Sequence, residues 1–241
     1  MTVVLDDLVD RVAGLTFPDL PEPTVRRVEL LVADLVGAAV AGARRGELPR
    51  YADKAASTRQ ARMLVPGDRW GEAGVAAFVN GCACVALELD DGLVGGGHAG
   101  AHVIPAALAA AQRAHRAGRE LVVAVAAGYE VAARLFRAFR LRHPAHPHGH
   151  LGAVGGAVAV ALLSGTDPVA AARVASTLPI LSTWAACFEG ASARNAVVGL
   201  ANLVAITSVD LADAGFTGAA DALEQAFGQV AGERRDLAGL A

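Results

Sequence analysis

Residues 87–105 read LELDDGLVGGGHAGAHVIP, and they separate two of the most apolar segments of the chain. Three carboxylates end the first apolar segment and two histidines follow a glycine-rich stretch: Glu88, Asp90, Asp91, His98 and His102. Carboxylates that face an imidazole across a flexible loop can transfer protons. The same composition is typical of a helix end followed by a solvated turn. Both interpretations stay open at this point.

Apolar periodicity on both sides of this stretch predicts an all-α protein. Apolar residues recur at the three- and four-residue spacing that gives a helix a buried face. We expect about nine helices, over residues 2–15, 24–43, 71–89, 101–116, 119–140, 151–164, 168–178, 194–212 and 220–227. Residues 61–65 are compatible with one short strand, and the tail, residues 232–241, is expected to fray. Since no linker or repeat divides the chain, residues 1–241 are expected to form a single helical domain.

The composition predicts a cellular location and argues against nucleic acid and membranes as partners. Acidic and basic residues are well mixed around a net charge of −3, so we expect no nucleic-acid partner. The longest uncharged runs are shorter than the roughly 18–20 residues of a membrane span, so we expect no membrane contact. The first ten residues, MTVVLDDLVD, carry acids where a signal peptide needs positive charge. With three unpaired cysteines, this favours a reducing cytoplasm.

A second polar segment, residues 143–150, reads HPAHPHGH and holds four of the seven histidines. Clustered imidazoles can bind a metal ion. However, Pro144 and Pro147 favour an extended backbone, in which neighbouring histidines point in different directions. We therefore predict no metal and no cofactor, and we favour a polar loop that lines a pocket.

Several short blocks occur in one order along the chain. They are Glu88-Leu-Asp90-Asp91, His98-Ala99-Gly100, Ile104-Pro105-Ala106, GYEVAARL at residues 128–135, His143-Pro144 with Gly149 and Gly152, and GFTG at residues 215–218. In this order and spacing they resemble the MmgE/PrpD family, which includes 2-methylcitrate dehydratase, cis-aconitate decarboxylase and iminodisuccinate epimerase. The resemblance implies the helical domain of that family and a homodimer built through it.

The resemblance also implies an active site lined by the first acid of a D-x-D-D segment, two motif histidines and a lysine. Carried over one by one, these positions are Glu88, His98, His143 and Arg194. The family lysine has become an arginine, which keeps its charge but cannot release a proton at working pH. The other departures are Glu for Asp at position 88, Ala99 for proline, Val197 for histidine, and Gly92 where some members have threonine.

The implied function is a metal-independent lyase or isomerase that abstracts and transfers a proton on a carboxylate-bearing small molecule. We expect His98 and His143 to act as base and acid in either order, with Asp90 or Asp91 orienting an imidazole. Substrate binding is assigned to Glu88, Arg194, His102 and His150. Structural alternatives stay open. In these alternatives the aspartates cap the chain around the glycine loop, His98 only hydrogen-bonds the backbone, and Arg194 lies at the surface or at a helix start.

Family members are near twice this length and carry a C-terminal lid, so we expect a lidless variant with a larger substrate. A secondary-metabolite intermediate that undergoes dehydration, isomerisation or cyclisation would fit. A catalytically silent helical subunit that needs a separate lid-supplying protein, or a small-molecule carrier, is the alternative.

Overall fold

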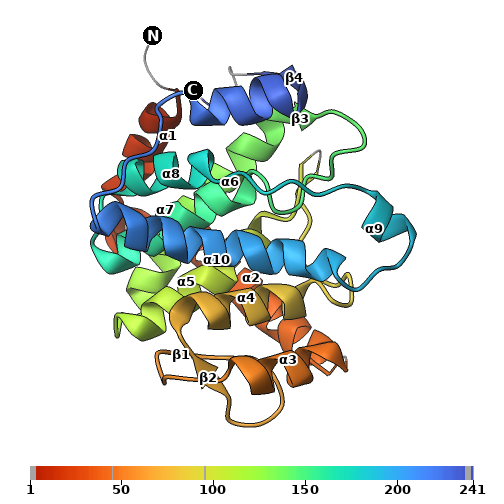
Figure 1. Cartoon of the computed structure of the whole chain (residues 1–241). Coiled ribbons are helices and arrows are strands. Elements are labelled where there is room, and N and C mark those ends of the chain that lie inside the picture. Colours follow the sequence, from red (N-terminus) through yellow and green to blue (C-terminus); the bar gives the residue numbers. More distant parts are fainter. Residues whose placement is uncertain (1–3, 45, 95, 237–239, 241) are drawn as a thin grey trace.

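Two helices with few polar residues, α5 (Ala99–Arg113) and α7 (Gly152–Ser164), form the centre of the computed structural model (Figure 1). Nearly every residue of α7 is buried, and its composition of Gly, Ala, Val and Leu allows neighbours on all sides. The structure describes residues 4–44, 46–94, 96–236 and 240.

Eight further α-helices lie within the described residues. They are α1 (Val4–Ala13), α2 (Glu22–Gly42), α3 (Glu47–Ala55), α4 (Ala73–Cys84), α6 (Gly118–Ala138), α8 (Pro168–Thr177), α9 (Ala185–Phe188) and α10 (Arg194–Asp213). A 3-10 turn spans Phe17–Asp19, and a π-helical segment spans Glu224–Val230, close to the helix expected at 220–227. The predicted all-α class is confirmed. The predicted start of the first helix at residue 2 lies outside the described residues.

Two small antiparallel sheets accompany the helices. Strand β1 (Ala61–Arg62) pairs with β2 (Trp70–Gly71), which places a strand within the segment predicted to hold one. Strand β3 (Phe139–Leu141) pairs with β4 (Gly232–Arg235). The expectation of a frayed tail is therefore wrong for β4, because its backbone is paired with residues that directly follow α6. Leu240 is buried as well.

Glycines let the central helices approach closely. A Cβ on Gly128 of α6 would lie 2.5 Å from the carbonyl oxygen of Gly155 in α7, and a Cβ on Gly155 would lie 2.4 Å from that of Gly128. Only a residue without a side chain fits at such a backbone contact.

Pro105 lies inside α5, and a residue of α10 compensates for the bond that this proline removes. A proline has no N–H, so it cannot donate to the carbonyl four residues earlier, that of Ala101. The buried Asn202 donates from Nδ2 to this carbonyl over 3.0 Å, and its Oδ1 accepts from the N–H of Ala106 over 2.9 Å. Asn202 thus holds α5 against α10 at one depth and keeps the start of α5 in place.

Helix α10 is long and apolar enough to cross a membrane by length and composition. This is weak evidence, since a core helix passes the same test, and α10 packs against α4, α7 and α8 along its length (Figure 1).

Candidate active site

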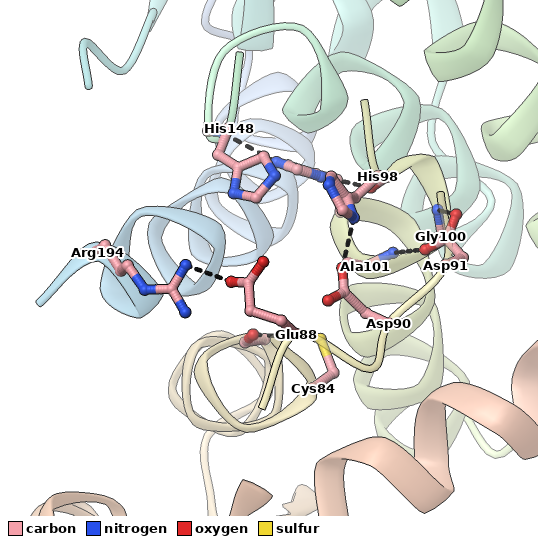
Figure 2. A network of polar contacts seen from close by, with 12 residues as sticks. Cys84, Glu88, Asp90, Asp91, His98, Gly100, Ala101, His148 and Arg194 are labelled. Atoms are coloured by element: carbon pink, nitrogen blue, oxygen red, sulfur yellow. Dashed lines mark hydrogen bonds and ion pairs between the residues drawn. The ribbon is translucent and has the colours of Figure 1, made fainter. Parts of the chain in front are cut away.

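The loop between α4 and α5 places a carboxylate beside an imidazole. Asp90 Oδ2 lies 2.7 Å from His98 Nδ1, and only 2% of the Asp90 side chain is exposed (Figure 2). His98 is the residue immediately before α5, so the helix start fixes its position. The contact with Asp90 raises the pKa of His98 above its usual 6.5, although burial of the ring acts in the opposite direction. Of the two aspartates, Asp90 is the one placed to orient an imidazole.

Asp91 has a different environment. Its Oδ2 accepts from the N–H of Gly100 and its Oδ1 from the N–H of Ala101, each over 3.0 Å. These N–H groups belong to the first turn of α5 and have no partner within the helix. Burial raises the pKa of Asp91, and the two hydrogen bonds partly offset this. Since both oxygens are engaged by the helix start, the capping interpretation describes Asp91, and its expected catalytic role is not supported.

His102, expected to bind substrate, is fully buried and hydrogen bonded to the backbone at both nitrogens. Its Nδ1 lies 2.6 Å from the carbonyl oxygen of His98, and its Nε2 accepts from the N–H of Gly149 over 2.9 Å. The ring is therefore neutral with its proton on Nδ1, and burial lowers its pKa to about 4. These contacts do not support the predicted substrate contact of His102, because the ring joins α5 to residues 143–150, the histidine loop, through both of its nitrogens.

His148 of the histidine loop lies next to His98. The two ring centroids are 4.5 Å apart in an edge-on arrangement, and the His146 ring contacts His148 at 4.3 Å. His146 accepts at Nδ1 from the N–H of His148, over 3.1 Å, and packs against Trp184 with centroids 4.1 Å apart. Burial lowers the pKa of His146 to about 4 and holds the pKa of His148 well below its usual value.

Ser182 holds the histidine loop in shape, and no motif in the sequence indicated this role. Its Oγ lies 2.7 Å from the carbonyl oxygen of His148 and 3.1 Å from that of His146. Its N–H donates to Nε2 of His150, whose ring is buried beside Phe227. Burial lowers the pKa of His150 to about 4. The ring stabilises the loop through Nε2 and also lines a pocket with Leu181 and Phe227, so the substrate contact of His150 stays a prediction.

His143 lies apart from this cluster. It is exposed and lines a cleft with Arg137 and Trp184, and among the described residues it has no ring or ion-pair contact with His98. The motif that selected it, a His-Pro with glycines six and nine positions later, occurs a second time at His146, with Gly152 and Gly155.

The sequence alone cannot decide whether His143 or His146 is the motif histidine, and the structure favours His146. His146 contacts His148 and feels the charge of His98 and Glu88, whereas His143 does not join them. The assignment of His143 is corrected to His146 on this ground.

Glu88 and Arg194 form an ion pair across the site (Figure 2). Arg194 is the first residue of α10, which confirms its predicted place at a helix start. Glu88 has a positive φ of 54°, a conformation that is uncommon for residues other than glycine. Both positions depart from the family pattern, and in the folded chain the two departures contact each other.

Figure 2 shows Glu88, Arg194, His148, His98 and Asp90 near one another, contributed by the α4–α5 loop, the histidine loop and the start of α10. Among the described residues, no group of three or more His, Cys, Asp or Glu side chains is arranged to hold a metal ion.

The MmgE/PrpD N-terminal domain matches residues 6–233 of the chain. The match covers most of the sequence, and the chain belongs to the MmgE/PrpD family. The resemblance seen in the sequence is confirmed. Membership implies a function of the dehydratase or lyase type in general. No curated protein matches the chain.

Proposed function

We propose that this protein is a metal-independent lyase or isomerase in which His98, oriented by Asp90, removes a proton from the carbon next to a substrate carboxylate. The observation that carries the proposal is the 2.7 Å contact between Asp90 Oδ2 and His98 Nδ1. A carboxylate at Nδ1 keeps the ring proton there and makes the other nitrogen more basic. Nε2 of His98 is then the atom that accepts the substrate proton.

His146 and His148 complement this base as neutral hydrogen-bond donors. Their lowered pKa values keep them uncharged at neutral pH. His146 accepts at Nδ1, so its ring proton lies on Nε2. A neutral imidazole can stabilise a developing oxyanion or a leaving oxygen by donating such a proton. The pKa of His98 is raised while the pKa values of His146 and His148 are lowered, which supports His98 as the base and the other two as neutral donors.

Arg194 supplies the positive charge for the substrate carboxylate. The guanidinium presents a planar set of donors that matches a carboxylate, and Glu88 occupies part of it in this structure. Dehydration, isomerisation and cyclisation share the same first step, so the proposal covers all three on a carboxylate-bearing, larger substrate such as a secondary-metabolite intermediate.

The pH dependence follows from the direction of the His98 shift. A base is active when it is deprotonated, and Asp90 raises the pKa of His98 above 6.5. Proton abstraction should therefore increase with pH through this raised pKa and be lost as the pH falls below it.

The test is deuterium exchange at the carbon next to the carboxylate, measured by NMR in D₂O on a panel of mono- and polycarboxylates. His98→Gln should reduce exchange by about 100-fold or more, the usual share of a general base. His143→Gln is the matched control, since His143 is exposed and lies outside the cluster, and it should leave exchange unchanged. If both variants exchange like the wild type, the proposed role of His98 is wrong.

A ligand-binding protein, or a catalytically silent subunit that needs a lid-supplying partner, is the second candidate. It is favoured by the Glu88–Arg194 pair, which already neutralises Arg194. Ligand binding without exchange would support it. The homodimer and the cytoplasmic location stay predictions.

A further inference from the structure

An open cleft of about 840 Å³ adjoins the Glu88–Arg194 pair. Helices α3 and α4 and the start of α10 contribute its lining. Apolar side chains form much of its wall, among them Leu48, Tyr51 and Phe78. The Tyr51 and Phe78 rings contact each other with centroids 5.4 Å apart, and 47% of Tyr51 is exposed. The volume lies within the range of small-molecule sites, and the wall offers apolar surface beside one cation.

The charges of this cleft do not suit a polycarboxylate. Among the described residues that line it, Arg194 is the one Lys or Arg, and two carboxylates, Glu47 and Glu88, lie in the same lining. Glu88 is already paired with Arg194. A ligand with a second or third carboxylate would therefore bring charges that no cation of the described lining compensates, and removing such charges from water is unfavourable.

We infer that the cleft binds the apolar body of a monocarboxylic acid whose single carboxylate reaches Arg194. The inference rests on the proposed function for the role of Arg194 as the carboxylate site, and it adds the chemical class of the substrate. The aromatic pair of Tyr51 and Phe78 contacts the apolar body, and this contact supplies binding energy that Arg194, already paired with Glu88, does not.

The experiment titrates the whole chain with octanoate, 4-phenylbutyrate and propane-1,2,3-tricarboxylate by calorimetry. A second readout locates the ligand by the rate at which N-ethylmaleimide labels Cys187, followed by mass spectrometry. Cys187 lines the cleft and is partly exposed, whereas Cys82 and Cys84 are buried. Burial raises the pKa of the Cys82 thiol to about 12 and raises the pKa of Cys84 as well, which makes both unreactive.

We expect both apolar acids to bind and to slow the labelling of Cys187. The tricarboxylate should bind with an affinity at least about ten-fold lower. Tyr51→Ser should weaken the binding of 4-phenylbutyrate by about five-fold, because apolar contact with the ligand is lost. Phe216→Ser is the matched control, because Phe216 is 61% exposed and lies outside the cleft, and it should leave the affinity unchanged.

The inference is overturned if the tricarboxylate binds as tightly as the apolar acids, if those acids do not bind, or if they bind without protecting Cys187. These outcomes are distinct from a failure of the proposed function. Deuterium exchange on a polycarboxylate that depends on His98 would keep the proposed function and reject the monocarboxylate. Binding that depends on Tyr51 without exchange on any acid would keep the ligand class and reject the reaction.

Discussion

Replacing Asp90 by Asn removes one charge from the Asp90–His98 pair and preserves the size of the side chain. The amide keeps an oxygen that can accept from His98 Nδ1, so the variant tests the charge of Asp90 more than its shape. Asp90 is nearly inaccessible at its side chain and lies 2.7 Å from the imidazole nitrogen. The effect should therefore appear in the free energy of unfolding and should depend on the protonation of His98.

The magnitude follows from the contact distance. Opposite unit charges 2.7 Å apart attract by about 6 kcal/mol at an effective dielectric constant of about 20. The burial of a carboxylate offsets several kcal/mol of this attraction. Removing one partner of a buried charged pair therefore leaves a net cost of about 1–3 kcal/mol, and we expect a loss of that size at pH 5.5, where His98 is protonated.

The direction with pH follows from the raised pKa of His98. A histidine whose pKa is higher in the folded state stabilises the protein fully below its unfolded value of about 6.5. This contribution is lost as the pH rises through the folded pKa. Above the folded pKa of His98 the pair is a neutral imidazole and a carboxylate, and the loss in Asp90→Asn should fall to about 1 kcal/mol or less.

The assay is urea denaturation of wild type and variant at pH 5.5, 7 and 9, with the difference in unfolding free energy compared at each pH. The matched control is Asp210→Asn, which removes the exposed partner of Arg113. Arginine stays charged across this range, so the control should lose about 0–1 kcal/mol at every pH. An equal loss in Asp90→Asn at pH 5.5 and pH 9, or a larger loss at pH 9, would refute the reasoning.

Three further predictions concern stability and binding. Asn202→Ala should cost about 2–4 kcal/mol in urea denaturation, because it leaves a buried carbonyl and a buried N–H unpaired; in a Pro105→Ala background the loss should shrink, since an alanine at this position can donate within α5, and an undiminished loss would contradict this. Gly152→Ala should destabilise by about 1–3 kcal/mol, because its Cβ would lie 2.4 Å from a buried imidazole side chain. The control Gly37→Ala should stabilise α2 by about 0.5–1 kcal/mol, because Gly37 is exposed and an added Cβ would have nothing within 4 Å. Glu88→Gln should strengthen the binding of a monocarboxylate several-fold in calorimetry, because it frees the guanidinium of α10; an unchanged affinity would show that the two carboxylates do not compete.

The long helices were predictable because their buried faces repeat within the sequence itself. Helix α3 could not be predicted in this way, because only Ala52 of its nine residues is buried and its segment is rich in charged residues. The β3–β4 pairing was missed for another reason: a strand of three residues meets one of four from the far end of the chain. No local pattern records such a long-range contact, so the tail was expected to fray.

The candidate site shows the same limit at the level of single residues. Carboxylates and histidines lie near one another in the sequence, yet Asp90 and Asp91 have similar local contexts and opposite roles in the structure. The direction of each side chain depends on where α5 begins. Likewise, His143-Pro144 and His146-Pro147 are each followed by glycines six and nine positions after the histidine. Only the path of the loop brings His146, and not His143, to His148.

Glu88 and Arg194 change meaning once they are considered together. In the sequence they are two separate departures from the family pattern, 106 residues apart, and each taken alone suggests a weakened site. In the folded chain they form one ion pair, so a longer acid and a planar cation have been accommodated jointly. Because the pair is already neutral, a carboxylate alone gains less at Arg194 than it would at an unpaired cation. A ligand must then derive more of its affinity from elsewhere, and the apolar wall of Tyr51 and Phe78 lies beside the pair.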